Sequence, residues 1–245
     1  MDCDYHISNK RKTPSCDKIK ERKKKINLQK KRKIQMGKIS GFSDGNNKTG
    51  TNGGCFDSVR IWNMPYYLTC PGASELCKKI CYCAEYMSDG RSDANYLMFL
   101  ENRLKLEEEI VNYLNIEIKG KLCAIRLHSE GDFFSKEYIA FWYKIMKKFP
   151  QVYFWAYTKS WRVKNLKSYL DKLEELPNFN LYYSWDKSMD DMTNHKQAIL
   201  VKDYAEIKKY NNAIVCPEQY NFVQCCADCG ICLHNKNKDI IFLMH

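Results

Sequence analysis

The sequence lacks the long apolar runs of membrane proteins. No stretch of its 245 residues approaches the roughly 20 consecutive apolar residues that a membrane-spanning helix needs. The first six residues, Met1 to His6, also lack the apolar core of a secretion signal. At 44% hydrophobic and 13% aromatic residues, the composition is that of a globular chain and not of a disordered one. We therefore expect a cytoplasmic protein with no membrane partner.

Acidic residues are scarce at one end of the chain only. Residues 1–40 hold 14 Lys and Arg against 4 Asp and Glu, a net charge of +10, whereas the other 205 residues have a net charge of +1. The few apolar residues of this leader keep no helical period. The sequence predicts a basic flexible leader (1–40) followed by one domain (41–245). Residues 10–38 would bind DNA or RNA by neutralising phosphates, or the leader is a solvated tail without a partner.

Disulfides are not expected, because a secretion signal is lacking and the number of cysteines, 13, is odd. Nine of the cysteines fall in two tight groups, at positions 70, 77, 81 and 83 and at positions 216, 225, 226, 229 and 232. In a reducing compartment, thiols spaced so closely are typical of metal ligands. Cys3, Cys16, Cys55 and Cys123 look like ordinary cysteines.

The distal group has the spacing of an iron–sulfur site. Cys226, Cys229 and Cys232 form two consecutive C-x2-C steps, and Cys216 is followed by Pro217. This run resembles the C-x2-C-x2-C run of bacterial ferredoxins, although there the Cys-Pro pair follows the run. Zinc is the alternative metal, because a zinc site usually joins two separated C-x2-C pairs. The role of Cys225 is left open.

The proximal group offers three well-spaced ligands, Cys70, Cys77 and Cys81. Cys83 follows Cys81 too closely to serve comfortably as a fourth ligand, and its role is left open. Three thiolates on a 4Fe-4S cluster would leave one iron free to bind a small molecule. The proximal group is therefore the expected place for chemistry, and the distal group for a structural role.

Strands and helices alternate along the rest of the sequence. We expect helices over residues 93–118, 136–149 and 161–176, the second of them capped by Ser135 and stopped by Pro150. Expected strands are 59–64, 121–127, 151–157, 179–185, 198–201, 213–215 and 240–243. This order predicts an α/β fold, either a partial (β/α) barrel or an open parallel sheet of about six strands, with cysteine-rich metal-binding loops.

Ligands of such folds bind beyond the carboxyl ends of the strands. Arg126, His128, Glu130 and Asp132 follow one strand in alternation, and we expect all four on one side of the sheet. Glu130 or Asp132 would bind an ammonium group and Arg126 a carboxylate. The alternative is that His128 and Asp132 only satisfy the loop and cap the next helix. Lys159, at the end of the next strand, is a further expected ligand contact.

Several motifs occur in a fixed order along the chain. They are Asn47-Lys48, Thr69-Cys70-Pro71-Gly72-Ala73 through Cys77-Lys78-Lys79-Ile80-Cys81-Tyr82, Arg126-x-His128-x-x-Gly131-Asp132-Phe133, Trp155-Ala156-Tyr157-Thr158-Lys159-Ser160 and the distal cysteine run. Together they resemble the "gene product 88" family of phages and plasmids. The resemblance covers roughly residues 42–235 and implies a mobile-element protein with iron–sulfur ligands.

A more distant resemblance is to the radical S-adenosylmethionine superfamily. In that superfamily, a C-x3-C-x2-C loop after the first strand of a partial barrel holds a 4Fe-4S cluster, and a Gly-Gly-Glu turn receives the cofactor's amino group. Here Cys77-x3-Cys81 follows the first strand and Glu130 lies in the turn after the second. The third cysteine is one residue too close, so the resemblance implies Cys70 as the third ligand.

Three functions follow as alternatives. The first is an iron–sulfur enzyme that uses S-adenosylmethionine and a reductant such as ferredoxin or flavodoxin, with an unknown substrate. The second is a nucleic-acid-binding accessory protein whose iron–sulfur or zinc sites only stabilise the fold. The third is an electron carrier with one or two clusters.

Overall fold

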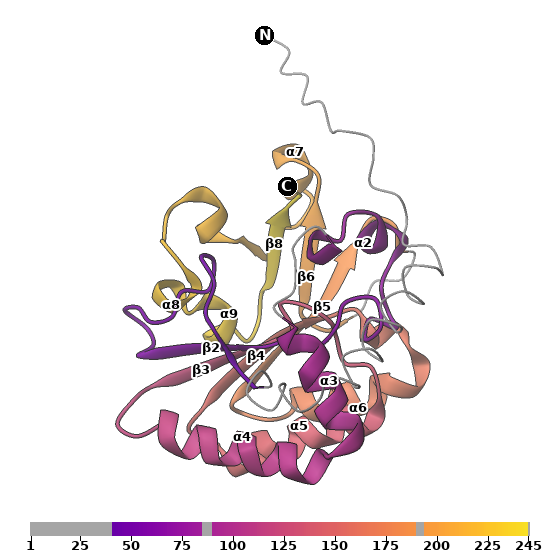
Figure 1. Cartoon of the computed structure of the whole chain (residues 1–245). Coiled ribbons are helices and arrows are strands. Elements are labelled where there is room, and N and C mark those ends of the chain that lie inside the picture. Colours follow the sequence, from indigo (N-terminus) through magenta and orange to yellow (C-terminus); the bar gives the residue numbers. More distant parts are fainter. Residues whose placement is uncertain (1–40, 85–89, 190–193, 245) are drawn as a thin grey trace.

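One twisted sheet of eight strands organises the protein. The computed structural model describes residues 41–84, 90–189 and 194–244 (Figure 1). The strand order is β1-β2-β3-β4-β5-β6-β8-β7, and every neighbouring pair is parallel except β1 with β2. The strands are β1 (Ser43–Asp44), β2 (Ser58–Trp62), β3 (Cys123–Leu127), β4 (Tyr153–Thr158), β5 (Phe179–Asp186), β6 (Gln197–Val201), β7 (Ala213–Val215) and β8 (Asp239–Leu243).

Four long helices cover one face of this sheet, which we call the helix face. They are α3 (Arg91–Glu101), α4 (Arg103–Glu117), α5 (Lys136–Lys148) and α6 (Lys164–Glu174). Alternate strand residues such as Trp62, Ile125 and Phe154 pack with them in the main hydrophobic core. Ser135 caps α5 as expected, since its Oγ accepts a hydrogen bond from Tyr138 N at 3.2 Å.

Short helices and loops cover the opposite face, which we call the cysteine face. Ala227 and Leu233 pack there on Val59, Ala124 and Trp155, the strand residues that alternate with those of the helix face. Figure 1 shows α8 and α9 on the side of the sheet away from α4 and α5. The remaining short elements are α2 (Glu75–Lys79), α7 (Tyr204–Ile207), α8 (Cys226–Cys229), α9 (Ile231–His234), η2 (Tyr82–Ala84), η3 (Ser160–Arg162) and η4 (Pro217–Tyr220).

The observed sheet is open, so of the two expected architectures the open parallel sheet is present and the partial barrel is not. The helix expected over residues 93–118 is divided at Asn102, whose φ and ψ are −142° and 48°. This break changes which face is buried: Leu97 and Leu114 are buried as expected, whereas Leu100 and Leu104 are exposed. The apolar period that predicted one helix therefore spans two.

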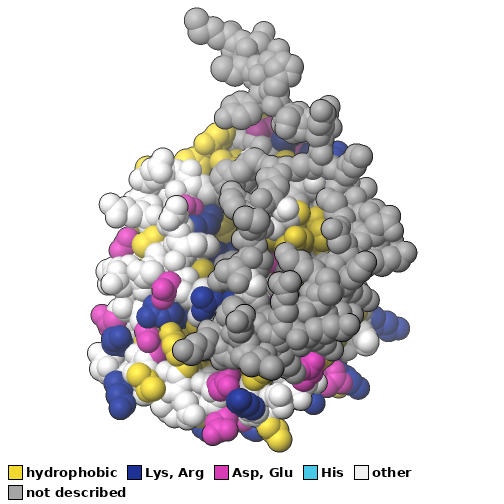
Figure 2. All heavy atoms as spheres, in the orientation of Figure 1, with side chains coloured by type: hydrophobic (Ala, Val, Ile, Leu, Met, Phe, Trp, Pro, Cys, Tyr) yellow, Lys and Arg dark blue, Asp and Glu magenta, His cyan; other side chains and the backbone are white. Residues whose placement is uncertain are grey.

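The described surface carries charges of both signs. In the view of Figure 2, Lys and Arg side chains alternate with Asp and Glu side chains over the part of the molecule where α4 lies in Figure 1. The expected leader, residues 1–40, lies outside the described residues. In the part of the chain that the structure describes, no helix is long and apolar enough to span a membrane.

Candidate metal centres

The distal cysteines converge on the cysteine face of the sheet. Cys216 follows β7, Cys226 and Cys229 lie on α8, and Cys232 lies on α9. Between the two helices, Gly230 adopts a φ of +64°, which a glycine tolerates and which reverses the chain. This reversal brings Cys232 back toward the other three thiols.

The distal thiols act on one another's ionisation, and Cys216 and Cys232 pack in one apolar cluster. Burial raises the pKa of Cys226 to about 11; Arg126 opposes this shift and Cys216 and Cys229 add to it. Burial also raises the pKa of Cys232 to about 12. The pKa of this thiol is raised further by the three other distal thiols, Cys226, Cys216 and Cys229. The four residues expected as distal ligands therefore lie within one shared electrostatic environment.

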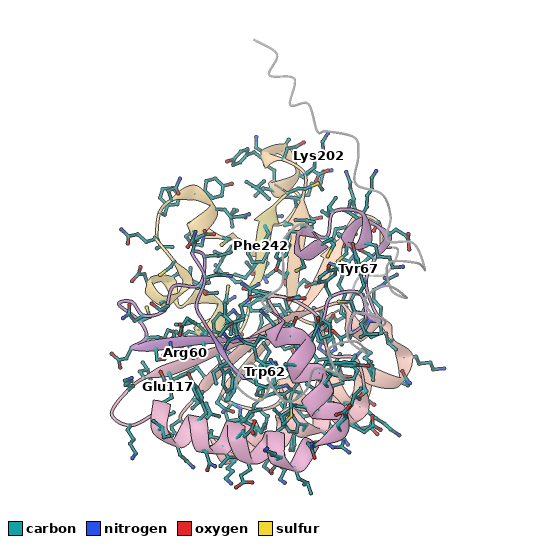
Figure 3. The ribbon with its side chains drawn as sticks, viewed as in Figure 1. Arg60, Trp62, Tyr67, Glu117, Lys202 and Phe242 are labelled. Carbon is teal, nitrogen blue, oxygen red and sulfur yellow. The ribbon has the colours of Figure 1, made fainter. Side chains whose placement is uncertain are left out.

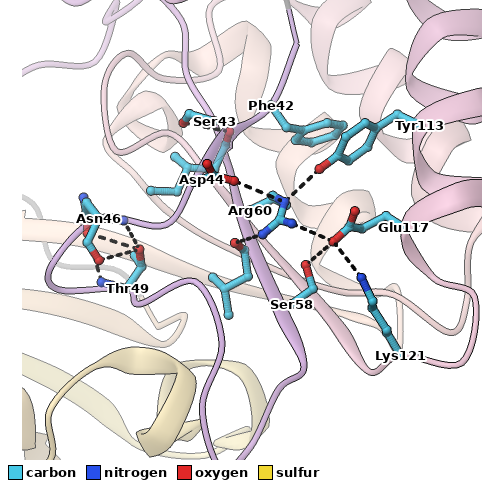
Figure 4. Close-up of polar contacts among 12 residues, drawn as sticks. Phe42, Ser43, Asp44, Asn46, Thr49, Ser58, Arg60, Tyr113, Glu117 and Lys121 are labelled. Atoms are coloured by element: carbon cyan, nitrogen blue, oxygen red, sulfur yellow. Dashed lines mark hydrogen bonds and ion pairs between the residues drawn. The ribbon is translucent and has the colours of Figure 1, made fainter.

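A glycine-rich loop (residues 45–54) holds the distal group against the sheet. Lys48 O accepts a hydrogen bond from Cys226 N at 2.8 Å, and Thr49 O accepts one from Ala227 N at 3.0 Å. The loop keeps its shape through Asn46, whose Oδ1 accepts from Thr49 N at 2.9 Å (Figure 4). The loop that contains Asn47-Lys48 therefore contacts the distal group through its backbone.

Two further cysteines lie beside this group. Cys55 Sγ donates to Asp228 O at 2.9 Å, and Cys225 Sγ donates to Asp228 Oδ2 at 3.3 Å. Both thiols contribute to the raised pKa of Cys229, after burial and Cys216. Sequence reasoning treated Cys55 as ordinary, and its position beside a glycine-rich loop was the only available signal.

The proximal cysteines lie at the carboxyl end of the parallel strands. Cys70 follows β2, Cys77 lies on α2, and Cys81 comes just before η2. Ser74 begins α2, since its Oγ accepts from Cys77 N at 3.0 Å, and it also donates to Asp186 Oδ2 at 2.5 Å. The α2 cap therefore fixes this cysteine loop to the end of β5.

A close backbone contact fixes the same loop to β4. A Cβ atom on Gly72 would lie 1.9 Å from the carbonyl oxygen of Lys159, so only glycine fits this approach. Arg162 Nη1 donates to the carbonyl of Gly72 at 3.1 Å and holds it there.

The three expected proximal ligands share one environment. Burial raises the pKa of Cys70, and Asp132, Cys77 and Cys81 act in the same direction. Burial raises the pKa of Cys77 to about 11, with Lys159 opposing and Cys81 contributing. A hydrogen bond with Cys83 lowers the pKa of Cys81 to about 7. Cys81 is therefore the most readily ionised of the three, and Cys83 is its hydrogen-bond partner.

Asp132 and Lys159 join neighbouring strand ends beside the proximal cysteines. Asp132 accepts hydrogen bonds from Phe133 N at 2.7 Å, Thr158 Oγ1 at 2.6 Å and Lys159 N at 2.8 Å. Lys159 Nζ lies 3.3 Å from Oδ2 of Asp186, which is fully buried. The charges of this network lie close enough to the proximal thiols to shift their pKa values.

Glu130 and Arg126 do not lie beside the same cysteine group. Glu130 Oε1 accepts from Ser92 Oγ at 3.2 Å, and its charge contributes to the raised pKa of Cys83. The guanidinium carbon of Arg126 lies 5.5 Å from the centre of the Tyr157 ring on the cysteine face. Arg126 therefore neighbours the distal thiols, and Glu130 lies on the Cys83 side of the proximal group.

His128 does not share a side with Arg126, so the expected alternation is wrong. The strand ends at Leu127, and His128 has a φ of +66°, which turns its side chain to the helix face. There its Nε2 lies 3.0 Å from Tyr138 Oη, and its ring packs on Phe133 with centroids 4.6 Å apart. His128 therefore packs against α5, and its Nδ1 has no hydrogen-bond partner among the described residues.

The burial of His128 predicts acid sensitivity. Burial, with a contribution from Arg126, lowers its pKa from 6.5 to about 3. The folded state therefore requires neutral His128, and stability is lost as the pH falls below 6.5, by about 2 kcal/mol at pH 5. We expect urea unfolding to show this loss between pH 7.5 and pH 5, and a smaller loss in His128→Asn. An equal loss in both proteins would contradict the prediction.

A third group of possible ligands, Asp171, Glu174 and His195, lies on the helix side. His195 Nδ1 lies 2.8 Å from Glu174 Oε2, and its Nε2 lies 3.1 Å from Lys167 Nζ. The same ammonium group lies 3.0 Å from Asp171 Oδ2. Because a lysine supplies the positive charge here, the group is a salt-bridge cluster.

Comparison with known proteins shows relatives of this chain. The family model described as Gene product 88 matches residues 20–236. The chain is 28% identical over 200 residues to the Gene 88 protein of Mycobacterium phage D29, and 27% identical over 199 residues to that of Mycobacterium phage L5. Each alignment covers 71% of this chain and 81% of the phage protein. No solved structure matches the chain.

Proposed function

The chain belongs to the gene product 88 family, and we propose that it is an iron–sulfur protein with a cluster on each cysteine group. The observation that carries this proposal is the convergence of Cys216, Cys226, Cys229 and Cys232 on one face of the sheet. The guanidinium of Arg126 acts on these thiols and has no carboxylate partner among the described residues, and a bound metal that holds the thiols as thiolates would supply the missing negative charge.

As they stand, the described cysteine sulfurs are spaced too widely to bind a single zinc ion. Four thiolates bound to one zinc at about 2.3 Å lie roughly 3.8 Å from one another. Among the described residues, no three cysteine sulfurs lie within 4.8 Å of one another. An iron–sulfur cluster places each thiolate on a different iron, so its ligands stand farther apart.

The proximal group supports an enzymatic role within this proposal. Cys70, Cys77 and Cys81 would hold a cluster by three thiolates, which supplies an iron for an amino-acid-like ligand such as the methionine part of S-adenosylmethionine. Lys159 and Asp132, which join the strand ends beside these thiols, would position that ligand's charged groups. The substrate class is left unassigned.

The test of the iron–sulfur proposal is anaerobic purification of the full chain, followed by iron and acid-labile sulfide analysis. Two 4Fe-4S clusters predict about eight iron and eight sulfide per chain, with a paramagnetic signal on reduction. One or two zinc ions per chain without sulfide would contradict the proposal.

A second candidate function is nucleic-acid binding, favoured by the basic leader. Exposed aromatic rings on the described surface add to it, because nucleobases stack on such rings. Tyr204 and Phe222 are 60% and 79% exposed, and the ring of Tyr220 lies between them, 5.4 Å from Tyr204 and 6.0 Å from Phe222.

Deletion of residues 1–38 tests this second candidate. The truncated chain should keep its iron and its fold but lose most of its salt-dependent affinity for a single-stranded oligonucleotide, because the deletion removes almost all of the net charge. Fluorescence anisotropy at two salt concentrations measures this loss. If the truncated chain binds as tightly as the full chain, the leader is not the binding segment.

A further inference from the structure

Arg126 is a cation without a hydrogen-bond or ion-pair partner among the described residues, and its guanidinium lies against the ring of Tyr157. It lies on β3 and its side chain points to the cysteine face, where its Nε atom is inaccessible to solvent and has no hydrogen-bond partner among the described residues. No carboxylate of residues 41–84, 90–189 or 194–244 forms an ion pair with it. Arg126 is half-buried, and a negative group beside its guanidinium would compensate the charge that its unpaired Nε shares.

Arg60, on the neighbouring strand β2, shows how the same sheet satisfies an arginine. Its Nε donates to Tyr113 Oη at 2.8 Å, and its Nη2 donates to Glu117 Oε1 at 2.8 Å (Figure 4). Asp44 adds a carboxylate oxygen at 3.7 Å. Figure 3 labels Arg60 and Glu117 next to each other on the left of the view. Arg126 lacks such a set of acceptors on its own face.

The groups that surround Arg126 are thiols and aromatic rings. Burial alone would lower the pKa of Arg126. Its pKa is raised overall, because four neighbouring groups favour the charged guanidinium: Tyr82, Tyr157, Cys226 and Cys232. Tyr157 packs on Phe242 of β8, with ring centroids 5.4 Å apart (Figure 3 labels Phe242). Among these described neighbours, the cysteines become anions near neutral pH once they bind metal.

Lys48 cannot take the place of Arg126. Its ammonium group also opposes the raised pKa of Cys226, but it lies 3.0 Å from Glu218 Oε2 and its charge is compensated there. A metal centre with four thiolates is a net anion, because the thiolates outweigh the core that they hold. The positive charge of Arg126 is therefore opposite in sign to the net charge of the centre.

We propose that Arg126 is a positioning residue of the distal centre, where its guanidinium supplies the counter-charge to the thiolates of Cys226 and Cys232. This assignment rests on the proposed function. A positive charge beside a cluster favours its reduced form, since reduction adds an electron, and it also opposes release of the thiolates from the metal.

The test compares Arg126→Gln and Arg126→Lys with Arg60→Gln in the full anaerobic chain. Arg126→Gln should lower the reduction potential of one of the two paramagnetic signals and should speed the loss of iron to a chelator by about tenfold or more. Arg126→Lys should restore most of both properties, because it keeps the charge. Arg60→Gln should lower thermal stability but leave the potential and the iron loss unchanged.

The outcomes separate this proposal from the one on which it rests. An Arg126→Gln protein with the potential and iron retention of the wild type would overturn the role of Arg126 while leaving the iron–sulfur proposal intact. A wild-type chain that carries no metal would contradict both proposals.

Discussion

Replacing Cys229 and Cys232 together by serine is expected to leave the chain insoluble or molten. Metal binding in structural sites contributes about 10–16 kcal/mol in zinc-finger peptides, whereas net stabilities of domains are about 5–15 kcal/mol. Cys229 ends α8 and Cys232 lies on α9, so their loss also frees Ala227 and Leu233 from the core of the cysteine face. Near-ultraviolet circular dichroism and dye binding to exposed apolar surface measure the result.

Cys123→Ala is the matched control for this double variant. Cys123 is also a buried cysteine, but it packs in the core of the helix face, away from the distal group. Its replacement should cost only about 1 kcal/mol and should leave the iron content unchanged. A soluble Cys229→Ser/Cys232→Ser protein with unchanged thermal stability would contradict a structural role for the distal centre.

The larger elements of the fold could be predicted from the sequence. All seven expected strands are present within a few residues, because their apolar runs are continuous, and α5 begins and ends where Ser135 and Pro150 predict. The break at Asn102 was not predictable, since apolar residues continue at helical spacing through it. Helices of four residues such as α8 and α9 are too short to show a period.

The order of the last strands in the sheet could not be predicted from the sequence. β8 pairs with β6 on one side and with β7 on the other. The last strand in the sequence therefore lies between β6 and β7 in the sheet. This arrangement places β7, and with it Cys216, at the edge of the sheet, and residues 216–238 return from there over the cysteine face to β8. Spacing along the chain shows which cysteines cluster but not which face they cover.

Within the site, sequence reasoning was strongest for the cysteines and weakest for the polar residues after β3. The seven cysteines expected as ligands lie in two groups as the spacing indicated, and their metal stays a proposal. The alternation rule failed for His128 because it assumes extended backbone, and the backbone leaves that conformation directly after Leu127. Cys55 was missed because Cys216 lies 161 positions further along the chain.

Replacing Cys77 by serine is expected to remove about half of the iron while the chain stays folded. Neither α2 nor η2 buries a side chain, so the core does not depend on the proximal loop as it does on the distal one. In the wild type, S-adenosylmethionine should shift the paramagnetic spectrum of the reduced protein. The Cys77→Ser protein should lose that response, and Glu130→Ala should weaken it.

Cys83→Ser is the control that decides whether the proximal cluster has an open iron. Cys83 is the hydrogen-bond partner of Cys81, and its own pKa is raised by that bond and by burial. If three thiolates hold the cluster, Cys83→Ser should keep its iron and its response to S-adenosylmethionine, because Cys70, Cys77 and Cys81 are unchanged. If Cys83 is a fourth ligand, the variant should lose iron. A wild-type spectrum indifferent to S-adenosylmethionine would then contradict the enzymatic role and leave the proximal cluster a structural one.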